Sequence, residues 1–391
     1  MTETLIPTLA ACLCAFSGTP AFAQTVIVVD DDGGAGVDYT DIQPAIDAAG
    51  PLDRIEVRNG SYGSFVASGP VSIIGKDSGS GTAFVNQGVF TGVMSGEVAV
   101  LADLTVRTLV LTDSDGALVV DAARADRIEV ARCADARLQS LAGNYFGRPG
   151  SLDVVDSFVQ CLDLFIQPGV PLGLEEDGYP AITSTRSTLY LTDCTIQGGE
   201  GGDQGFCLGG YVPSGGPALA LRSSDVRLLG SEINGGFPGY NCFGFPSGNF
   251  GLSIEFLDGG STVVESDTSL LYGLSGPGTV TSLPGLPWLA LSGSAAPGTT
   301  ALFDVHAEPG SVLRAVLGRR PVVDSVPGLE VPLLHSAERG VGLGTTPGTG
   351  SNSFPFVVPA LPTGTLIHVQ SSRTTGGGAT ELSNSVTVVV R

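Results

Sequence analysis

Carboxylates at a regular spacing are the first feature of this sequence that could carry chemistry. Asp156, Asp193, Gly230 and Asp267 follow one another at steps of 37 residues. If the units of a repeat stack about 4.8 Å apart, Asp156 and Asp193 form a like-charged pair. Such a pair suits a hard cation such as Ca²⁺, or raises the pKa of one carboxyl group. We favour the other interpretation, that each Asp caps the turn after its strand, because Asp is common in turns and Gly230 interrupts the column.

Arginines accompany these carboxylates. Arg186, Arg222 and Arg227 lie on expected strands or at their ends. They could act as bases in an elimination or clamp a carboxylate of the substrate. The interpretation that we favour is a surface arginine that neutralises an acidic neighbour. The catalytic candidates are therefore Asp156, Asp193, Arg186 and Arg227, for a polysaccharide lyase or glycoside hydrolase acting on an acidic polysaccharide.

A third group of candidates is aromatic. The segment from Gly198 to Gly251 is rich in aromatic residues, which could stack on sugar rings or pack on one another as a small core, the interpretation that we favour. Cys207 and Cys242 lie 35 residues apart, close to one repeat, so stacking predicts a disulfide between them. The ligand-binding candidates are Phe206, Tyr211, Phe237, Tyr240, Phe243 and Phe245, and Phe250 belongs to the same segment.

The sequence offers few residues for a metal site or for acid–base catalysis by histidine. His306, His335 and His368 are all in the last quarter of the chain, far apart, and we expect structural or exposed roles for them. The acidic runs at residues 30–33 and 113–116 lack the full ligand spacing of an EF-hand loop, which favours solvated turns. No cofactor is therefore expected, and Ca²⁺ remains a weak candidate at Asp156 and Asp193.

The elements that position these residues follow from the repeat. Apolar residues alternate within each unit, as in a strand with one buried face, and glycine-rich loops join the units without an amphipathic helix. A βαβ crossover is therefore excluded, and each unit must stack on copies of itself. These features predict a parallel β-helix over residues 24–283. Two apolar columns at the 37-residue step carry the prediction: Leu152, Leu189, Val226 and Val263, and Val159, Ile196, Ile233 and Leu270.

The open end of such a stack needs a cap, because unpaired strand edges promote aggregation. Residues 39–49 have apolar side chains at helical spacing, with Thr40 or Asp41 available as the N-cap. The stretch 38–49, the strand 55–57 with its turn 60–62, and residues 71–75 resemble the N-terminal cap of right-handed β-helix proteins with the pectin-lyase-like fold. The resemblance covers roughly residues 25–283. It implies a right-handed β-helix, a fold that hosts lyases, hydrolases, esterases, adhesins and inactive surface proteins.

The catalytic motifs of these enzyme families are missing. Polygalacturonase-like hydrolases use a Gly-His-Gly segment, and residues 24–285 contain no histidine. Pectate and pectin lyases have a Trp-containing Asp-His segment, but the one tryptophan is Trp288, outside the β-helix. The Gly-x-x-Asp-Phe-Ile-Phe-Gly run of pectin methylesterases is not found either. These differences favour a non-catalytic role.

Both ends of the chain differ from the repeat. Residues 1–23 read as a secretory signal, with an apolar run from Leu5 to Phe16 and an A-x-A cleavage site before Gln24, although the first residues carry no positive charge. Lipidation at Cys12 is the alternative that we favour less. Cleavage leaves five cysteines, of which Cys133, Cys161 and Cys194 have no assigned partner. Short alternating strands separated by Pro and Gly predict a β-sandwich over residues 286–391.

Composition limits the partners. The 391 residues carry a net charge of −21, which argues against nucleic acid, and no apolar run is long enough for a membrane-spanning helix. We expect a secreted or cell-surface module, non-catalytic, whose loops bind a polysaccharide or another surface component. The alternatives are the lyase or hydrolase described above and a purely structural or adhesive repeat protein. The oligomeric state is left open.

Overall fold

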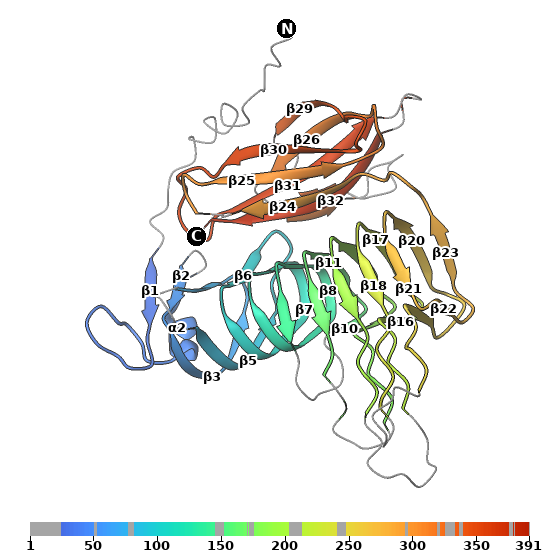
Figure 1. The fold of residues 1–391 in the computed structure, drawn as a ribbon. Helices are drawn as coiled ribbons and strands as arrows, with labels where there is room; N and C mark the ends of the chain where they lie inside the picture. Colours follow the sequence, from blue (N-terminus) through green and yellow to red (C-terminus); the bar gives the residue numbers. More distant parts are fainter. Residues whose placement is uncertain are drawn as a thin grey trace. The chain divides into compact units, whose positions relative to one another are not determined.

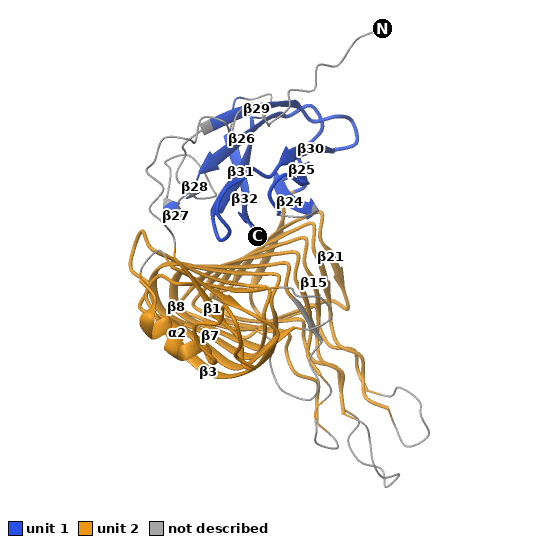
Figure 2. Ribbon diagram, turned by 90° about the vertical axis from the view of Figure 1, so that its left-hand side faces the viewer, with its two compact units in different colours: residues 1–24, 284–391 blue, residues 25–283 orange. Residues whose placement is uncertain are grey.

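The computed structural model describes most of the chain in two compact units, residues 25–283 and residues 284–391 (Figure 2). Each unit is considered by itself. The predicted signal segment, residues 1–23, lies outside the described residues. The described residues are 25–50, 53–76, 82–144, 152–169, 171, 176–202, 213–240, 248–293, 296–318, 321–324, 333–335, 339–374, 378 and 380–390.

The first unit is a parallel β-helix, as the repeat predicts (Figure 1). Its coils pair in register through three stacks of parallel strands. The first stack contains β1 (Val26–Val29), β2 (Arg54–Val57), β4 (Ser72–Gly75), β6 (Val98–Ala102), the second halves of β7 (Thr105–Asp121) and β8 (Arg124–Gln139), β11 (Phe158–Leu162), β14 (Thr188–Thr192), β17 (Asp225–Leu229), β20 (Thr262–Ser266) and β23 (Thr279–Ser282).

The other two stacks complete each coil. The second stack contains β3 (Gly60–Ser68), β5 (Ala83–Thr91), the first halves of β7 and β8, β10 (Leu152–Val155), β13 (Ile182–Thr185), β16 (Leu219–Arg222), β19 (Ile254–Phe256) and β22 (Leu274–Ser275). The third stack contains β9 (Ala142–Asn144), β12 (Phe165–Gln167), β15 (Thr195–Gln197), β18 (Glu232–Asn234) and β21 (Ser269–Leu271).

The strands form because every second side chain enters one continuous core. Leu189 and Leu191 of β14 are fully buried. Leu189 is in register with Val226 and Val263 on the next two coils. Each such side chain contributes about 1.5–3 kcal/mol when it is removed from water. A shift of one residue would turn the apolar set outward, so this core fixes the register.

The 37-residue step is correct from β14 through β17 to β20 but wrong for the preceding coil. Leu152 pairs with Ile182, and Val159 pairs with Leu189, so that coil advances by 30 residues. Leu152 of β10 and Val159 of β11 lie seven residues apart, and the two strands share one apolar pattern. An ungapped step of 37 residues therefore aligns the second-stack strand of one coil with the first-stack strand of the next.

A short helix lies near the first coils. In α2 (Ile42–Ala48), the N-cap residue is Asp41, whose carboxylate accepts a hydrogen bond of 2.8 Å from the backbone N–H of Ile42. Ile42 and Ala45 are buried in the β-helix core. The role of this segment as an N-terminal cap stays a prediction. None of the helices that the structure describes is long and apolar enough to span a bilayer.

The second unit is an antiparallel β-sandwich. One sheet contains β24 (Trp288–Gly293), β25 (Thr300–His306) and β30 (Ser351–Val357), and the other contains β29 (Arg339–Thr345), β26 (Val312–Gly318), β31 (Leu366–Thr374) and β32 (Thr380–Val389). A small ribbon joins β27 (Pro321–Asp324) and β28 (Leu333–His335). The amide of Asn384 on β32 links the sheets, because it donates to the carbonyl of Leu289 at 2.8 Å and accepts from its N–H at 2.7 Å.

Two histidines of this unit have different surroundings. The ring of His306 stacks on Trp288 with centroids 3.6 Å apart, while Nδ1 of the buried His368 is 2.8 Å from the hydroxyl of Thr387. The side chain of His335 lies outside the described residues. These contacts agree with structural roles for His306 and His368.

Candidate functional site

A glycine-rich arm leaves the β-helix between the third and second stacks of three successive coils. We use this name for the described parts of residues 168–181, 198–218 and 235–253, which run outward from the coils in Figures 1 and 2. Backbone hydrogen bonds of 2.8–2.9 Å connect five of its passes, running from Gly251 through Gly236, Gly216 and Gly199 to Tyr179. The arm is therefore held together by its own backbone, although it contains none of the strands.

Glycine is required where these passes meet. A Cβ atom added at Gly236 would overlap the carbonyl oxygen of Gly199, and one added at Gly251 would overlap that of Gly216. Gly199, Gly216 and Gly236 are buried between neighbouring passes. Close approach of two backbones is the usual reason for glycine in such a position. The glycines of the sequence thus form a rigid support, where the repeat had suggested simple loops.

An exposed aromatic cluster lies at the base of this arm. We use this name for Phe237, Phe250 and Tyr272. The rings of Phe250 and Tyr272 are stacked, with centroids 4.5 Å apart and planes 5° apart, and the ring of Phe237 meets Phe250 edge-on at 5.8 Å. The three residues keep 45%, 46% and 43% of their surface exposed. Tyr240 of the same arm is exposed as well.

The backbone of Tyr272 is strained. Its φ is +76°, in the left-handed region that suits glycine and that bulky residues rarely adopt. Such strain costs about 1–3 kcal/mol and persists only where the surroundings enforce it, most often at functional sites. Sequence reasoning missed Tyr272 because it follows β21, outside the aromatic-rich segment. A tyrosine directly before Gly273, at the point where the other coils extend their arms, was the available signal.

Several predicted site residues fall outside the described residues. Phe237 and Tyr240 are the two ligand-binding candidates whose positions can be given. The others are Phe206, Tyr211, Phe243 and Phe245, together with both cysteines of the predicted disulfide, Cys207 and Cys242. Their roles stay predictions. Cys133, Cys161 and Cys194 are buried free thiols.

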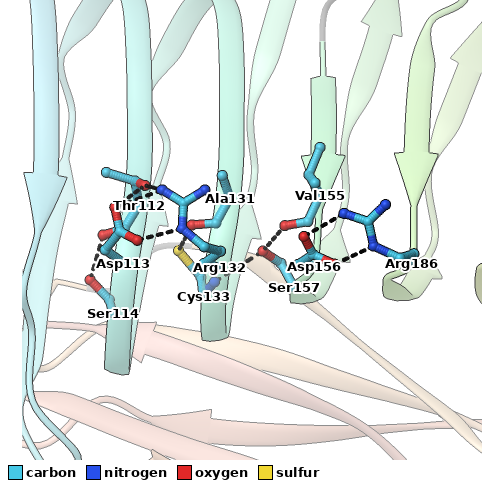
Figure 3. Close-up of polar contacts among 10 residues, drawn as sticks. All are labelled: Thr112, Asp113, Ser114, Ala131, Arg132, Cys133, Val155, Asp156, Ser157 and Arg186. Carbon is cyan, nitrogen blue, oxygen red and sulfur yellow. Dashed lines mark hydrogen bonds and ion pairs between the residues drawn. The ribbon is translucent and has the colours of Figure 1, made fainter.

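A polar ladder runs along the corner between the second and first stacks (Figure 3). Asp113, Arg132, Asp156 and Arg186 occupy equivalent positions on successive coils, each with φ near +50°. Both guanidinium groups contact a carboxylate through two nitrogens. Arg186 Nε and Nη2 each donate to Asp156 at 2.7 Å, and Arg132 Nη2 donates to Asp113 at 2.8 Å. Two-point contact gives these pairs a defined geometry.

Hydroxyl groups just inside this corner hold its turn in place. Ser157 Oγ donates to the carbonyl of Val155 at 2.7 Å and accepts from the N–H of Cys133 at 3.0 Å (Figure 3). Ser187 repeats the pattern one coil later, with the carbonyl of Thr185 and the N–H of Ser157. Buried backbone groups need such partners where a strand ends.

The pairing sets the protonation of the ladder. Hydrogen bonds from Arg186 lower the pKa of Asp156, and those from Arg132 lower the pKa of Asp113 to about 2. The same contacts raise the pKa values of Arg132 and Arg186. At neutral pH these carboxyl groups hold no proton to donate, and the guanidinium groups hold theirs. The ladder thus supports the interpretation in which arginine neutralises a turn aspartate.

The predicted pair of Asp156 and Asp193 is wrong. Asp193 lies at the opposite end of the first-stack strands, in register with Asp163 and Gly230. The like-charged neighbours are therefore Asp163 and Asp193, and burial together with the charge of Asp193 raises the pKa of Asp163. The 30-residue step, which matches residues 157–167 with 187–197, was the signal for this pair.

The remaining candidates do not converge on one site. The guanidinium carbon of Arg227, on β17, lies 5.6 Å from the ring centroid of Tyr190 on β14. Asp156 and Arg186 lie just before first-stack strands, whereas Asp193 lies just after one. The acidic run near the N-terminus contacts the next coil. Asp30 forms an ion pair with Arg58 at 3.1 Å, and Asp31 accepts a hydrogen bond from the N–H of Ser61 at 2.8 Å.

Comparison with known proteins identifies neither a family nor a function for the chain. No protein-family model matches the chain, and no curated protein matches its sequence. The solved structures similar to it include the enzymatically active domain of tailspike protein 2 of bacteriophage CBA120. That similarity has 9% identity and a TM-score of 0.23, over 94% of this chain and 71% of that one. These values carry no argument for fold or function, and the parallel β-helix rests on the pairing of the strands.

Proposed function

We propose that this protein is an extracellular or surface module that binds a glycan chain across the aromatic cluster without cleaving it. The observation that carries the proposal is the set of exposed rings of Phe237, Phe250 and Tyr272 at the base of the glycine-rich arm. A flat aromatic ring offers an apolar surface on which the C–H face of a sugar ring can stack.

The geometry of the cluster favours binding over packing alone. The rings contact one another, which is the packing that we expected for this segment. Each nevertheless leaves more than two fifths of its surface in water. Exposed apolar patches of this kind mark interaction surfaces.

Rigidity adds a thermodynamic argument. The arm that has these rings at its base is connected pass to pass by backbone hydrogen bonds, and a side chain cannot be added at its buried glycines without displacing a neighbour. A surface that is already ordered loses less conformational entropy when a ligand binds. Long repeating chains suit it especially, since several sugar units can contact one rigid face.

The test is a panel of neutral and acidic polysaccharides incubated with the mature protein, with and without Ca²⁺. Retention in a pull-down and the molar-mass distribution of each polysaccharide are both measured. We expect at least one polysaccharide to be retained with its chain length unchanged. Shortened chains would replace this proposal with a lyase or hydrolase, and no retention across the panel would leave the structural or adhesive role.

A further inference from the structure

One connection near the N-terminal end of the β-helix is longer than its neighbours. Two-residue connections join the first stack to the next strand at residues 58–59, 103–104 and 122–123, whereas seven residues separate β4 from β5, of which Lys76 and Thr82 belong to the described residues. A pocket of about 200 Å³ lies at this point. Its lining comes from successive coils and includes Asn59, Lys76, Thr82, Asp103, Thr105 and Arg124.

The charge of this pocket differs from that of the chain. Lys76 and Arg124 line it in a protein whose net charge is −21. Lys76 Nζ is 2.9 Å from Glu56 Oε2, but the same carboxylate also pairs with Arg54. The charged side chains in the lining are therefore Lys76, Arg124 and the acidic Asp103.

The guanidinium group of Arg124 is the distinctive feature. It is exposed, and no carboxylate among the described residues forms an ion pair with it. By contrast, Arg132 and Arg186 in the polar ladder are both engaged. A guanidinium fork that faces a pocket is suited to two-point contact with a carboxylate, sulfate or phosphate group. The lysine adds a mobile charge, and Asn59, Thr82 and Thr105 bring further polar side chains to the lining.

We infer that this pocket is an oxyanion-binding site, in which Arg124 and Lys76 hold a carboxylate, sulfate or phosphate group of a small ligand. Its volume lies below the roughly 300–1,000 Å³ of pockets for drug-sized molecules, so the ligand is one charged group with a small body. The inference does not rest on the proposed glycan function. The pocket is formed by the first coils, whereas the aromatic cluster belongs to the last ones.

The single lysine of the chain provides a direct probe. Reductive methylation with ¹³C-formaldehyde labels the Lys76 amine and keeps its positive charge. The labelled α-amino group is recognised by its lower pKa, about 7.7–8.0. The full-length mature protein is titrated with inorganic phosphate, sulfate and glucuronate at constant ionic strength set by chloride, with glucose as the neutral control. We expect a saturable shift of the Lys76 signal with an oxyanion and none with glucose.

Two variants decide whether Arg124 takes part. Arg124→Gln should weaken oxyanion binding about three- to tenfold, the range for a charge-assisted hydrogen bond at a solvated site. Arg314→Gln, which removes another exposed arginine on β26, should leave it unchanged. Tighter binding of glucuronate would identify a carboxylate ligand, and tighter binding of phosphate or sulfate an inorganic or ester group. The inference fails if no oxyanion shifts the signal, or if Arg124→Gln binds like the unchanged protein.

Discussion

Single residues at the corners of the β-helix adopt a backbone that few side chains favour. Asp156 has φ +50° and Arg186 has φ +49°. Aspartate tolerates this region better than most residues, because its short polar side chain can bond locally. An arginine there is less usual, and the two-nitrogen contact with Asp156 explains how it is held. At this scale the charged ladder stabilises turns.

Substitution of Asp156 separates backbone strain from charge. Asp156→Gly removes the ion pair but suits a positive φ, whereas Asp156→Ala removes the pair and adds strain. We expect the alanine variant to melt about 2–4 °C below the glycine variant, as measured by circular dichroism. Equal melting temperatures would mean that the left-handed backbone at this corner costs nothing.

The same carboxylate should make stability depend on pH in one direction. Contacts with Arg186 place the pKa of Asp156 in the folded protein below its usual value of 3.8. A carboxyl group whose pKa is lower in the folded protein than in the unfolded one stabilises the fold when the pH lies above its unfolded pKa. This contribution is lost as the pH falls through its folded pKa. Asp156→Asn should therefore melt slightly below the unchanged protein at pH 7, and the difference should vanish in acid below the folded pKa.

The matched control for that experiment is Asp126→Asn. Asp126 is an exposed residue of β8, and no ion pair involves it among the described residues. Its melting temperature should follow the unchanged protein at both pH values. If the melting temperatures of the unchanged protein and of Asp156→Asn still differ in acid, the role assigned to the ion pair with Arg186 is contradicted.

At the level of elements, the strands could be predicted and the arm could not. Alternating Leu189 and Leu191 reveal a strand, because burial selects every second residue. The strand neighbours of Asp156 could not be predicted without the lengths of the irregular segments between the strands. One coil has 30 residues and the next ones have 37, so an alignment without gaps gives the wrong register. The glycines indicated loops, whereas their packing depends on hydrogen bonds between distant backbones. No local pattern encodes those bonds.

Gly236→Ala tests whether this packing supports the arm. The added methyl group would overlap the carbonyl oxygen of Gly199, so a neighbouring pass must move. We expect a lower melting temperature and weaker glycan retention, because Phe237 is the next residue along the chain. Gly259→Ala is the control, since its Cβ would meet nothing closer than 4.0 Å. Equal behaviour of the two variants would rule out close packing as the support.

At the scale of the whole β-helix, one core extends through all its coils. Cys133, Cys161 and Cys194 belong to it. Burial raises the pKa of Cys133 and of Cys194 to about 12 and that of Cys161 well above its usual range. Thiols in this state react poorly, since the thiolate is the nucleophile.

Alkylation of these thiols should therefore report opening of the core. We expect Cys161 and Cys194 to stay unmodified by iodoacetamide in the native protein, and to react together once denaturant unfolds the β-helix. Peptide mass spectrometry after timed quenching measures both sites. Rapid modification of either thiol under native conditions would contradict a continuous, closed core.

The most direct test of the central claim concerns Tyr272. Tyr272→Gly removes the ring and relieves the positive φ, so the gain in backbone energy offsets the lost stacking on Phe250 and stability should change little. Affinity electrophoresis against a retained polysaccharide then compares this variant with Phe250→Ala and with Phe165→Ala, an exposed phenylalanine outside the cluster. We predict that Tyr272→Gly and Phe250→Ala lose most of the retardation, while Phe165→Ala keeps it. Full retardation of Tyr272→Gly and Phe250→Ala would show that glycans do not bind at the aromatic cluster.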